Sequence, residues 1–255
     1  MVIDLNSDLG ESFGRYKLGC DEKLVPLLTS VNAACGFHAG DPIVMRKTVR
    51  LAKEAGVSVG AHPGFDDLQG FGRRNIVLSY DELYACVLYQ VGALDAFVKA
   101  EGMKLAHVKP HGAMYNMACK DKGMAGAICR AVKDYDPGLI ILAQESGLLY
   151  RTAVETGLKA AAEVFADRAY EEDGTLVARS KPGAMINDPK EALARVIRMI
   201  KDGKVTAVTG KDIPIKADSV CVHGDNEQAL AFIEEIRTEC AKEGIRISPI
   251  SQFIV

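Results

Sequence analysis

The 255-residue sequence lacks a large excess of charge of either sign, because 31 lysines and arginines face 34 aspartates and glutamates. The formal net charge is −3 at pH 7, and no block of like charges occurs. We therefore expect no nucleic-acid or membrane-surface partner. No apolar run approaches the roughly 18 residues that a membrane-spanning helix needs. The first residues do not predict a signal peptide either.

Paired cysteines are also missing, although the chain contains seven cysteines. None stand in a Cys-x-x-Cys pair, and an odd number disfavours a disulfide framework, so we expect a reduced, cytoplasmic protein. Two nucleotide-binding signatures are absent as well. There is no Gly-x-x-x-x-Gly-Lys-[Ser/Thr] loop, and no Gly-x-Gly-x-x-Gly follows a predicted strand. Any nucleotide must bind by another route or on another chain.

Predicted strands alternate with predicted helices along the whole chain. Strands are predicted at 2–8, 30–38, 57–63, 105–111, 139–144, 162–168 and 219–225, and helices at 42–55, 80–101, 124–132, 147–157, 189–200 and 226–243. We also expect a loop over an opening at 170–184, a small hairpin or an irregular segment at 205–217, and an extended tail at 245–255. Asp41, Ser79 with Glu82 in a capping box, and Asp188 are predicted to cap the starts of three helices, and Gly56 to end the first of them. The alternation favours parallel strands with right-handed crossovers. We predict one α/β domain over 1–255, an irregular (β/α) barrel of about seven parallel strands.

All five histidines fall at or near the predicted strand ends: His38, His62, His107, His111 and His223. Barrel enzymes build their sites at the carboxyl ends of their strands. One histidine there is more often a structural core residue. Five in the same kind of position favour a functional site at the barrel mouth.

The first strand adds a row of polar side chains to this mouth. Asp4, Asn6 and Asp8 share one strand face, which in a barrel points towards the axis. A polar row in that place indicates a hydrated or ligand-filled mouth. We interpret Asp4 as tying the strand to its neighbours, whereas Asp8 and Glu11 are better explained by function.

The segment around Lys109 leaves two roles open. The lysine could hold a carboxylate or phosphate or act as a base, or it could form a structural ion pair with a barrel carboxylate. His107 and His111 would lie about 13 Å apart on an extended strand, too far to share one ion. We interpret His107 as a structural hydrogen-bonding residue. No tightly bound metal is predicted, although a metal held by Asp8, His62 and His111 stays open.

Several motifs, in order along the whole chain, resemble the LamB/YcsF family. The N-terminal half contributes Asp4-Leu-Asn6-Ser-Asp8-Leu-Gly-Glu11, Asn32-Ala-Ala-Cys-Gly-Phe-His38-Ala-Gly-Asp41, Gly60-Ala-His62-Pro63 and Gly70-Phe-Gly-Arg73-Arg74. The rest contributes Val108-Lys109-Pro-His111-Gly-Ala-Met-Tyr115-Asn116, Glu163-Val-Phe-Ala-Asp167-Arg168 and Val222-His223-Gly-Asp225. The resemblance implies a barrel similar to the glycoside hydrolase and deacetylase group. It also implies an ATP-dependent 5-oxoprolinase activity, which opens the lactam of 5-oxo-L-proline to L-glutamate while ATP becomes ADP and phosphate.

The resemblance further implies ATP as co-substrate, with Mg²⁺, and two partner subunits, B and C. The catalytic candidates are Asp8, Glu11, His62, Lys109 and His111. The candidates for substrate binding are Asn6, Asn32, His38, Asp41, Arg73, Asn116, Asp167, Arg168, His223 and Asp225. Lys109 and Arg73 are the candidates for holding anionic groups. Two alternatives stay open: a stand-alone metal-dependent amidase or deacetylase, and a non-catalytic binding subunit of a larger hydrolase.

Overall fold

The computed structural model describes residues 1–222 and 227–254 of the chain. The strands are β1 (Val2–Leu9), β2 (Ser30–Ala34), β3 (Ser58–His62), β4 (Leu105–Val108), β5 (Ile140–Ala143), β6 (Lys159–Phe165), β7 (Lys204–Thr206), β8 (Asp212–Pro214), β9 (Ser219–Cys221) and β10 (Arg246–Ile247). The helices are α1 (Asp21–Leu24), α2 (Pro42–Ala55), α3 (Tyr80–Ala100), α4 (Gly112–Ala118), α5 (Lys122–Tyr135), α6 (Leu148–Glu155), α7 (Pro189–Asp202) and α8 (Glu227–Lys242). Two 3₁₀ turns are η1 (Val25–Leu27) and η2 (Ile250–Gln252).

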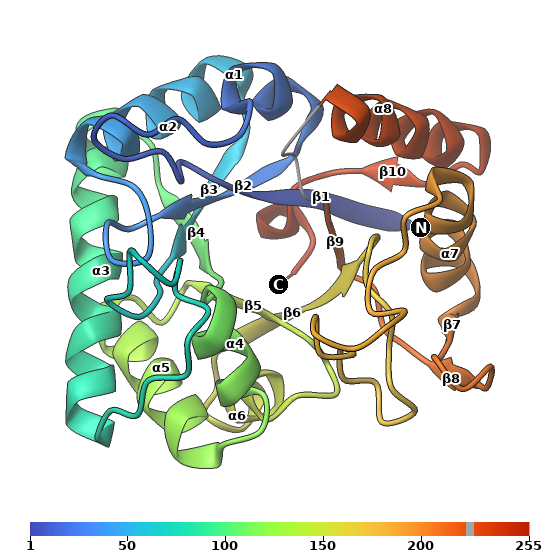
Figure 1. Cartoon of the computed structure of the whole chain (residues 1–255). Helices are drawn as coiled ribbons and strands as arrows, with labels where there is room; N and C mark the ends of the chain where they lie inside the picture. Colours follow the sequence, from blue (N-terminus) through green and yellow to red (C-terminus); the bar gives the residue numbers. More distant parts are fainter. Residues whose placement is uncertain (223–226, 255) are drawn as a thin grey trace.

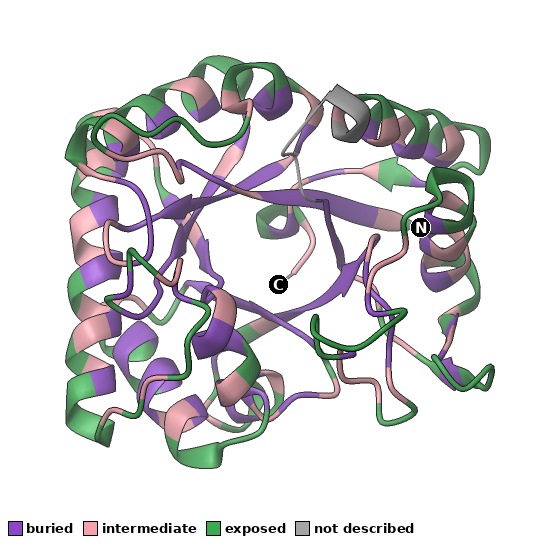
Figure 2. Cartoon of the chain, in the orientation of Figure 1, coloured by how far each residue is buried: buried purple, intermediate pink, exposed green. Residues whose placement is uncertain are grey.

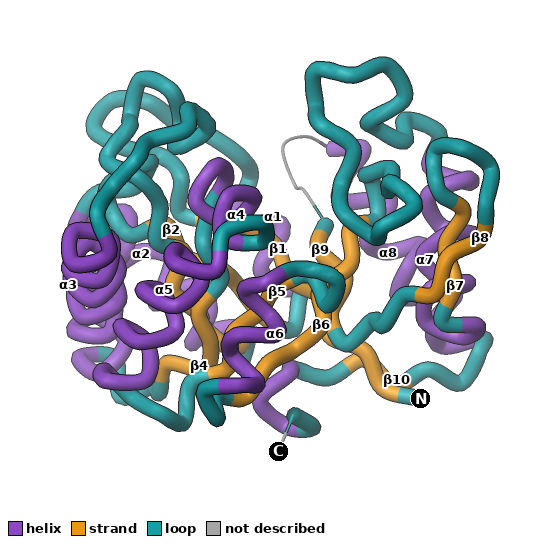
Figure 3. Tube along the Cα trace, turned by 90° about the horizontal axis from the view of Figure 1, so that it is seen from below, coloured by secondary structure: helices purple, strands orange, loops and turns teal. Residues whose placement is uncertain are grey.

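Seven parallel strands form a closed barrel, as predicted (Figure 1). The order is β1-β2-β3-β4-β5-β6-β9, and β9 pairs with both β6 and β1 to close the ring. The register at the closure joins Ser219 to Asp4 on one side and to Glu163 on the other. Parallel pairing aligns the carboxyl ends of all seven strands at one end of the barrel. Figure 3 shows the long loops gathered at that end, opposite the C-terminus.

Capping residues start and stop the outer helices where the sequence predicts. Asp41 caps α2, with Pro42 as its first residue, and Gly56 ends it in the left-handed conformation at φ 69°. Ser79 and Glu82 form the predicted capping box of α3. By length and composition α3 could cross a membrane. It packs on the outside of the barrel against β3, β4 and the neighbouring α2 and α5, and its buried apolar side chains belong to the hydrophobic core.

Most departures from the predicted elements lie at strand ends and in short segments. β2 ends at Ala34 and β4 at Val108, so the loops that follow them carry His38 and Lys109. The short helices α1 and α4 were not predicted. The helix α4 has only seven residues and begins at Gly112, whose φ of +54° lies in the left-handed region. Neither feature is a usual sequence signal for the start of a helix.

The prediction of an extended C-terminal tail is wrong for most of its length. Only Arg246 and Ile247 form a strand, and η2 follows them. Ile250 is fully buried against Ile140, Leu142 and Ala161, which lie in β5 and β6. The turn is therefore held against these strands through the Ile250 side chain, whose burial removes apolar surface from water. In Figure 1 the C-terminus accordingly lies in the middle of the ring.

The barrel interior is more polar than most. The seven barrel strands are buried along most of their length (Figure 2). Fully buried polar side chains nevertheless occur on several of them: Asp4, Asn6, Ser30, Asn32, His107 and Ser219. Branched apolar residues usually fill such a space. A buried polar group is costly unless it is hydrogen-bonded, so these residues need partners.

Candidate functional site at the barrel mouth

Four residues at the mouth, Glu11, His38, His62 and His111, form what we call the histidine cluster. One ligand atom from each lies within 4.8 Å of those of the other three. They follow β1, β2 and β4 or end β3, so the aligned strand ends bring them together. The rings of His38 and His111 stack, with centroids 3.8 Å apart and planes 3° from parallel. All three histidines are buried, and Glu11 is partly exposed.

Backbone carbonyls fix the protons of two of these rings. His62 Nδ1 lies 2.7 Å from the carbonyl oxygen of Lys109, and His111 Nε2 lies 2.8 Å from that of Phe71. A carbonyl can only accept, so each of these nitrogens carries the hydrogen. The two remaining nitrogens, His62 Nε2 and His111 Nδ1, face each other at 3.0 Å.

Burial favours the neutral form of two rings in the cluster, those of His38 and His111. Burial, reinforced by the neighbouring His38 and His62, lowers the pKa of His111 far below its usual value. Burial likewise lowers the pKa of His38. Both ring nitrogens of His38 lack a hydrogen-bond partner among the described residues. At neutral pH His38 and His111 therefore present lone pairs, which suits them to accept a proton or bind a cation.

Lys109 lies between two carboxylates rather than facing solvent. Its Nζ is 2.8 Å from Asp8 Oδ1 and 2.7 Å from Glu163 Oε1, and only 2% of the residue is exposed. Burial by itself lowers the pKa of Lys109, but the carboxylates of Asp8 and Glu163 raise it overall, so the lysine is charged. The structural ion pair that the sequence left open is thus present in the structure.

Glu163 and Tyr115 belong to this arrangement, although neither was among the predicted site residues. Tyr115 donates a hydrogen bond of 2.8 Å to Glu163 Oε2, and both residues are buried. Burial raises the pKa of Glu163. A glutamate inside the otherwise apolar run 160–165 was a usable signal, because such a residue must be paired to be buried.

Asn6 and Asn32, predicted to bind substrate, lie below the mouth and bond to other side chains. Asn32 Nδ2 donates to Asn6 Oδ1 at 2.7 Å and to Asp8 Oδ1 at 2.9 Å. Its Oδ1 lies 2.6 Å from His107 Nε2, which agrees with the structural role expected for His107. Asn6 Nδ2 in turn donates to the Ser219 hydroxyl at 2.7 Å. The amides therefore organise the floor of the site.

Asp4 ties β1 to three neighbouring hydroxyl groups, as its interpretation as a structural residue anticipates. The hydroxyls of Thr29 and Ser30 donate to Asp4 Oδ1 at 2.7 and 2.6 Å, and that of Ser219 donates to Oδ2. Burial raises the pKa of Asp4 to about 6, although these hydrogen bonds act in the opposite direction.

The other predicted residues lie around the mouth in different settings. Arg73 is exposed, with its guanidinium 5.0 Å from the centre of the Phe71 ring. Asn116 is exposed on α4. Both carboxylate oxygens of Asp41 accept backbone hydrogen bonds, from Ile43 and Val44 at the start of α2 and from Gly14. The predicted residues His223 and Asp225 lie outside the described residues.

A pocket of about 610 Å³ opens beside Glu163, between α6 and the loop after β6. Its size suits a small-molecule ligand. The loop is the predicted segment 170–184, and Arg168 anchors it by donating to the carbonyl of Val177 at 2.7 Å. Asp167 precedes this arginine and is partly exposed.

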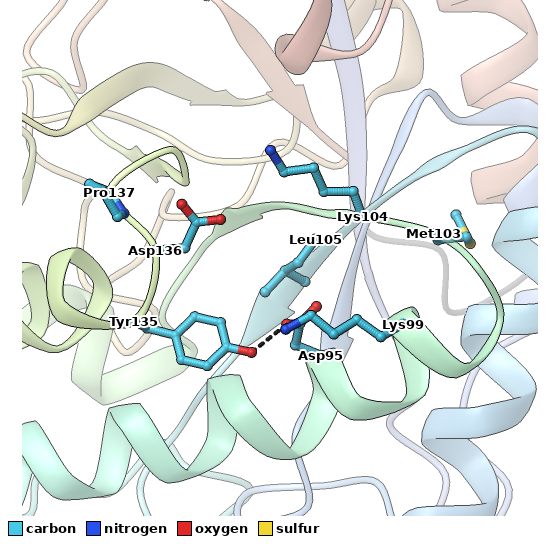
Figure 4. Close-up of a pocket in the computed structure, with 8 residues that line it drawn as sticks. All are labelled: Asp95, Lys99, Met103, Lys104, Leu105, Tyr135, Asp136 and Pro137. Carbon is cyan, nitrogen blue, oxygen red and sulfur yellow. Dashed lines mark hydrogen bonds and ion pairs between the residues drawn. The ribbon is translucent and has the colours of Figure 1, made fainter.

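A second pocket lies at the opposite end of the barrel, where the strands begin (Figure 4). It is lined by Asp95, Lys99, Met103, Lys104, Leu105, Tyr135, Asp136 and Pro137. It measures about 310 Å³ and contains no histidine. The length of β4 separates it from the mouth, because Leu105 is the first residue of that strand and His111 follows its end.

The fold and the mouth define a (β/α) barrel with a buried site of histidines and carboxylates at the carboxyl ends of its strands. A carbohydrate esterase of family 4 from Streptomyces lividans shares this fold, with a TM-score of 0.53 and 13% identity over 99% of this chain and 95% of that one. Residues 3–255 match the sequence model of the LamB/YcsF family, and the chain belongs to that family.

Several relatives are similar to this chain over nearly the whole length of both sequences. The A subunit of 5-oxoprolinase from Clostridium beijerinckii is 59% identical over 251 residues, covering 98% of each chain. That of Pyrococcus horikoshii is 55% identical and covers 100% of each. The crystal structure of the lactam utilization protein from Thermus thermophilus has a TM-score of 0.92 and 47% identity, over 97% of this chain and 99% of that one.

Proposed function

We propose that this chain is the A subunit of a 5-oxoprolinase and takes part in opening the lactam of 5-oxo-L-proline to L-glutamate. Full-length identity of 54–59% to proteins of that name supports the proposal. The observation that carries it is the mouth itself. Five residues with acid, base or charged side chains, Asp8, Glu11, His62, Lys109 and His111, meet there beside a ligand-sized pocket.

The proposed chemistry couples ring opening to ATP, because a five-membered lactam is a stable amide. Transfer of the γ-phosphoryl group to the lactam oxygen gives an imidate phosphate and ADP. Water adds to the carbon, the C–N bond breaks, and the ring nitrogen takes up protons to become the amino group. A second water then displaces phosphate from the resulting acyl phosphate and leaves L-glutamate.

The residues divide into a base group and a positioning group. His111 presents an unprotonated nitrogen beside His62, which suits it to take a proton from the attacking water. Lys109 is already neutralised by Asp8 and Glu163, so we assign it to holding these carboxylates in place. Arg73, which is exposed at the mouth, is the better candidate for a phosphate.

Replacing His111 and Arg73 tests these roles in the reconstituted complex. We expect His111→Ala to lower glutamate formation by about 10²-fold or more, as loss of a general base does. Arg73→Ala should raise the KM for ATP. Its matched control is Arg74→Ala, because the Arg74 guanidinium pairs with Asp67 instead. Full turnover by both His111→Ala and Lys109→Ala would contradict the assignment.

We also propose that the chain acts with subunits B and C, with ATP and Mg²⁺, in the cytoplasm, as a single domain. The word "subunit" in the names of its relatives supports partners. All seven cysteines are free thiols, which fits a reducing compartment. Glutamate formation from 5-oxoproline and ATP should require co-expressed partners. Turnover by this chain alone without ATP would instead favour a stand-alone amidase.

A further inference from the structure

We propose that the histidine cluster binds one divalent transition-metal ion, of which Zn²⁺ is the representative. His62 Nε2 and His111 Nδ1 are the primary ligands, and Glu11 and His38 complete the set. The proposal concerns only the residues of this chain and holds whichever lactam or amide is the substrate. When bound, such an ion supplies Lewis acidity at the mouth and occupies the lone pair of His111 Nδ1, so the role as general base proposed above for His111 applies to the chain without the ion.

The first argument is the direction of the two lone pairs. The Lys109 and Phe71 carbonyls hold the hydrogens on the outer nitrogens. With a single hydrogen on each ring, the inner nitrogens of His62 and His111 therefore point lone pairs at each other across 3.0 Å. Such an approach is repulsive unless a cation lies between them. Zinc–nitrogen bonds of about 2.0–2.1 Å in a tetrahedral site place two nitrogens about 3.3 Å apart, close to the observed separation.

The second argument is the hydrogen bonding of the outer nitrogens. A histidine that binds a metal almost always donates its other N–H to a carbonyl or carboxylate, which orients the ring and raises its basicity. His62 and His111 both do so, through Nδ1 and Nε2 respectively. The backbone thus presents the two rings to a common point.

The third argument is the set of donors around that point. Glu11 Oε1 lies 3.8 Å from His111 Nδ1 and 3.6 Å from His38 Nε2. The fully buried His38 has no hydrogen-bond partner for either ring nitrogen among the described residues. Its ring lies flat against that of His111, so it must turn to become a ligand. A binding ion would satisfy a nitrogen that is otherwise costly to bury.

Two glycines leave the room that these rings occupy. A Cβ at Gly72 would lie 2.7 Å from His38 Cβ and 2.8 Å from His111 Cδ2, and one at Gly64 would lie 2.6 Å from His38 Nδ1. Gly72 also has φ +62°, which an L side chain rarely adopts. The backbone at Gly64 and Gly72 therefore packs directly against the rings of His38 and His111, where a larger residue would not fit.

The donor chemistry selects the class of ion. Imidazole nitrogens with one carboxylate suit Zn²⁺ and similar borderline ions, whereas Mg²⁺ and Ca²⁺ require mainly oxygen ligands. Asp8 Oδ2 lies 3.4 Å from His62 Nε2, but Asp8 also pairs with Lys109. We therefore place it beside the ion rather than in the primary set.

Metal titration of the purified full chain tests the proposal without any substrate. The protein is stripped with a chelator, dialysed and titrated with Zn²⁺ by calorimetry, and X-ray absorption reports the ligand atoms. We expect one ion per chain with imidazole ligands. His62→Ala and His111→Ala should each weaken binding by about 10²-fold or more, and Glu11→Gln by about 10-fold.

The matched control is His107→Gln, which removes a buried histidine outside the cluster and should retain the ion. Thermal unfolding checks that each variant is folded. Because Glu11 is partly exposed, Glu11→Gln still gives a result if a histidine variant fails to fold. If wild type binds no more Zn²⁺ than the double variant His62→Ala/His111→Ala, a shared proton holds the pair and the proposal is overturned. Glutamate formation, measured separately, decides the proposed function.

Discussion

Two lysine–carboxylate pairs of nearly equal length lie at opposite ends of the barrel. Lys99 Nζ is 2.8 Å from Asp95 in the pocket of Figure 4, and Lys109 Nζ is 2.7 Å from Glu163 at the mouth. The Lys99 side chain is 72% exposed and that of Asp95 is 5% exposed, whereas those of Lys109 and Glu163 are 3% and 0% exposed. The distances are alike, but the surrounding dielectric is not.

This difference decides what each pair can do. Water screens a pair whose ammonium group is exposed and can take the place of that group when it is removed, so such a pair contributes little. A buried pair has lost its water, and each charge depends on its partner. The Asp95 carboxylate also accepts a hydrogen bond from Tyr135. We therefore expect the Lys99–Asp95 pair to contribute little to stability. Removing one charge of the Lys109–Glu163 pair should be costly.

The largest effect should follow from Lys109→Met. The change leaves the carboxylates of Asp8 and Glu163 together and without their cation. We expect the free energy of unfolding to fall by about 3–5 kcal/mol, as for other broken buried pairs. Urea denaturation measures it.

The double variant Lys109→Met/Glu163→Gln separates this cause from lost packing. If buried charge is responsible, removing the second charge restores part of the stability, and the two changes are not additive. If the losses of stability from the two single changes simply add, the two charges do not interact, and the effect of Lys109→Met comes from packing of the lysine methylenes.

Asp4 gives an intermediate effect, because it is a buried carboxylate with hydroxyl partners and no cation. Burial raises its pKa from 3.8 to about 6 in the folded state. The protonated form therefore contributes stability that is fully present below about pH 3.8 and is lost as the pH rises through 6, in total about 3 kcal/mol. Wild type minus Asp4→Asn should show this decline between pH 4 and 6 and be flat above pH 7. A flat difference throughout would mean that the pKa is not raised.

The smallest effect is expected for Lys99→Ala. Asp95 keeps its hydrogen bond from Tyr135, and water replaces the ammonium group. The urea midpoint should not differ from wild type beyond replicate scatter, and added salt should not change that result. A loss comparable to that of Lys109→Met would show that exposure does not separate the two pairs.

The sequence by itself determined the architecture of this protein. Strand and helix periodicity, with capping residues such as Asp41, Ser79 and Asp188, predicted the alternating elements and the seven-stranded barrel. These signals are local, since a cap or an apolar period depends only on neighbours in the chain. The aligned strand ends then predicted that His38, His62 and His111 would meet at one mouth.

Only the tertiary structure decided which side chains are partners. Glu163 and Lys109 are 54 positions apart, and nothing local says that their charges cancel. The inward lone pairs of His62 and His111 depend on two backbone carbonyls from other segments. The buried Ile250 turn depends on an apolar surface that exists only after the barrel closes. Local rules set the strands and helices, whereas pairing, burial and protonation are properties of residues brought together from distant positions.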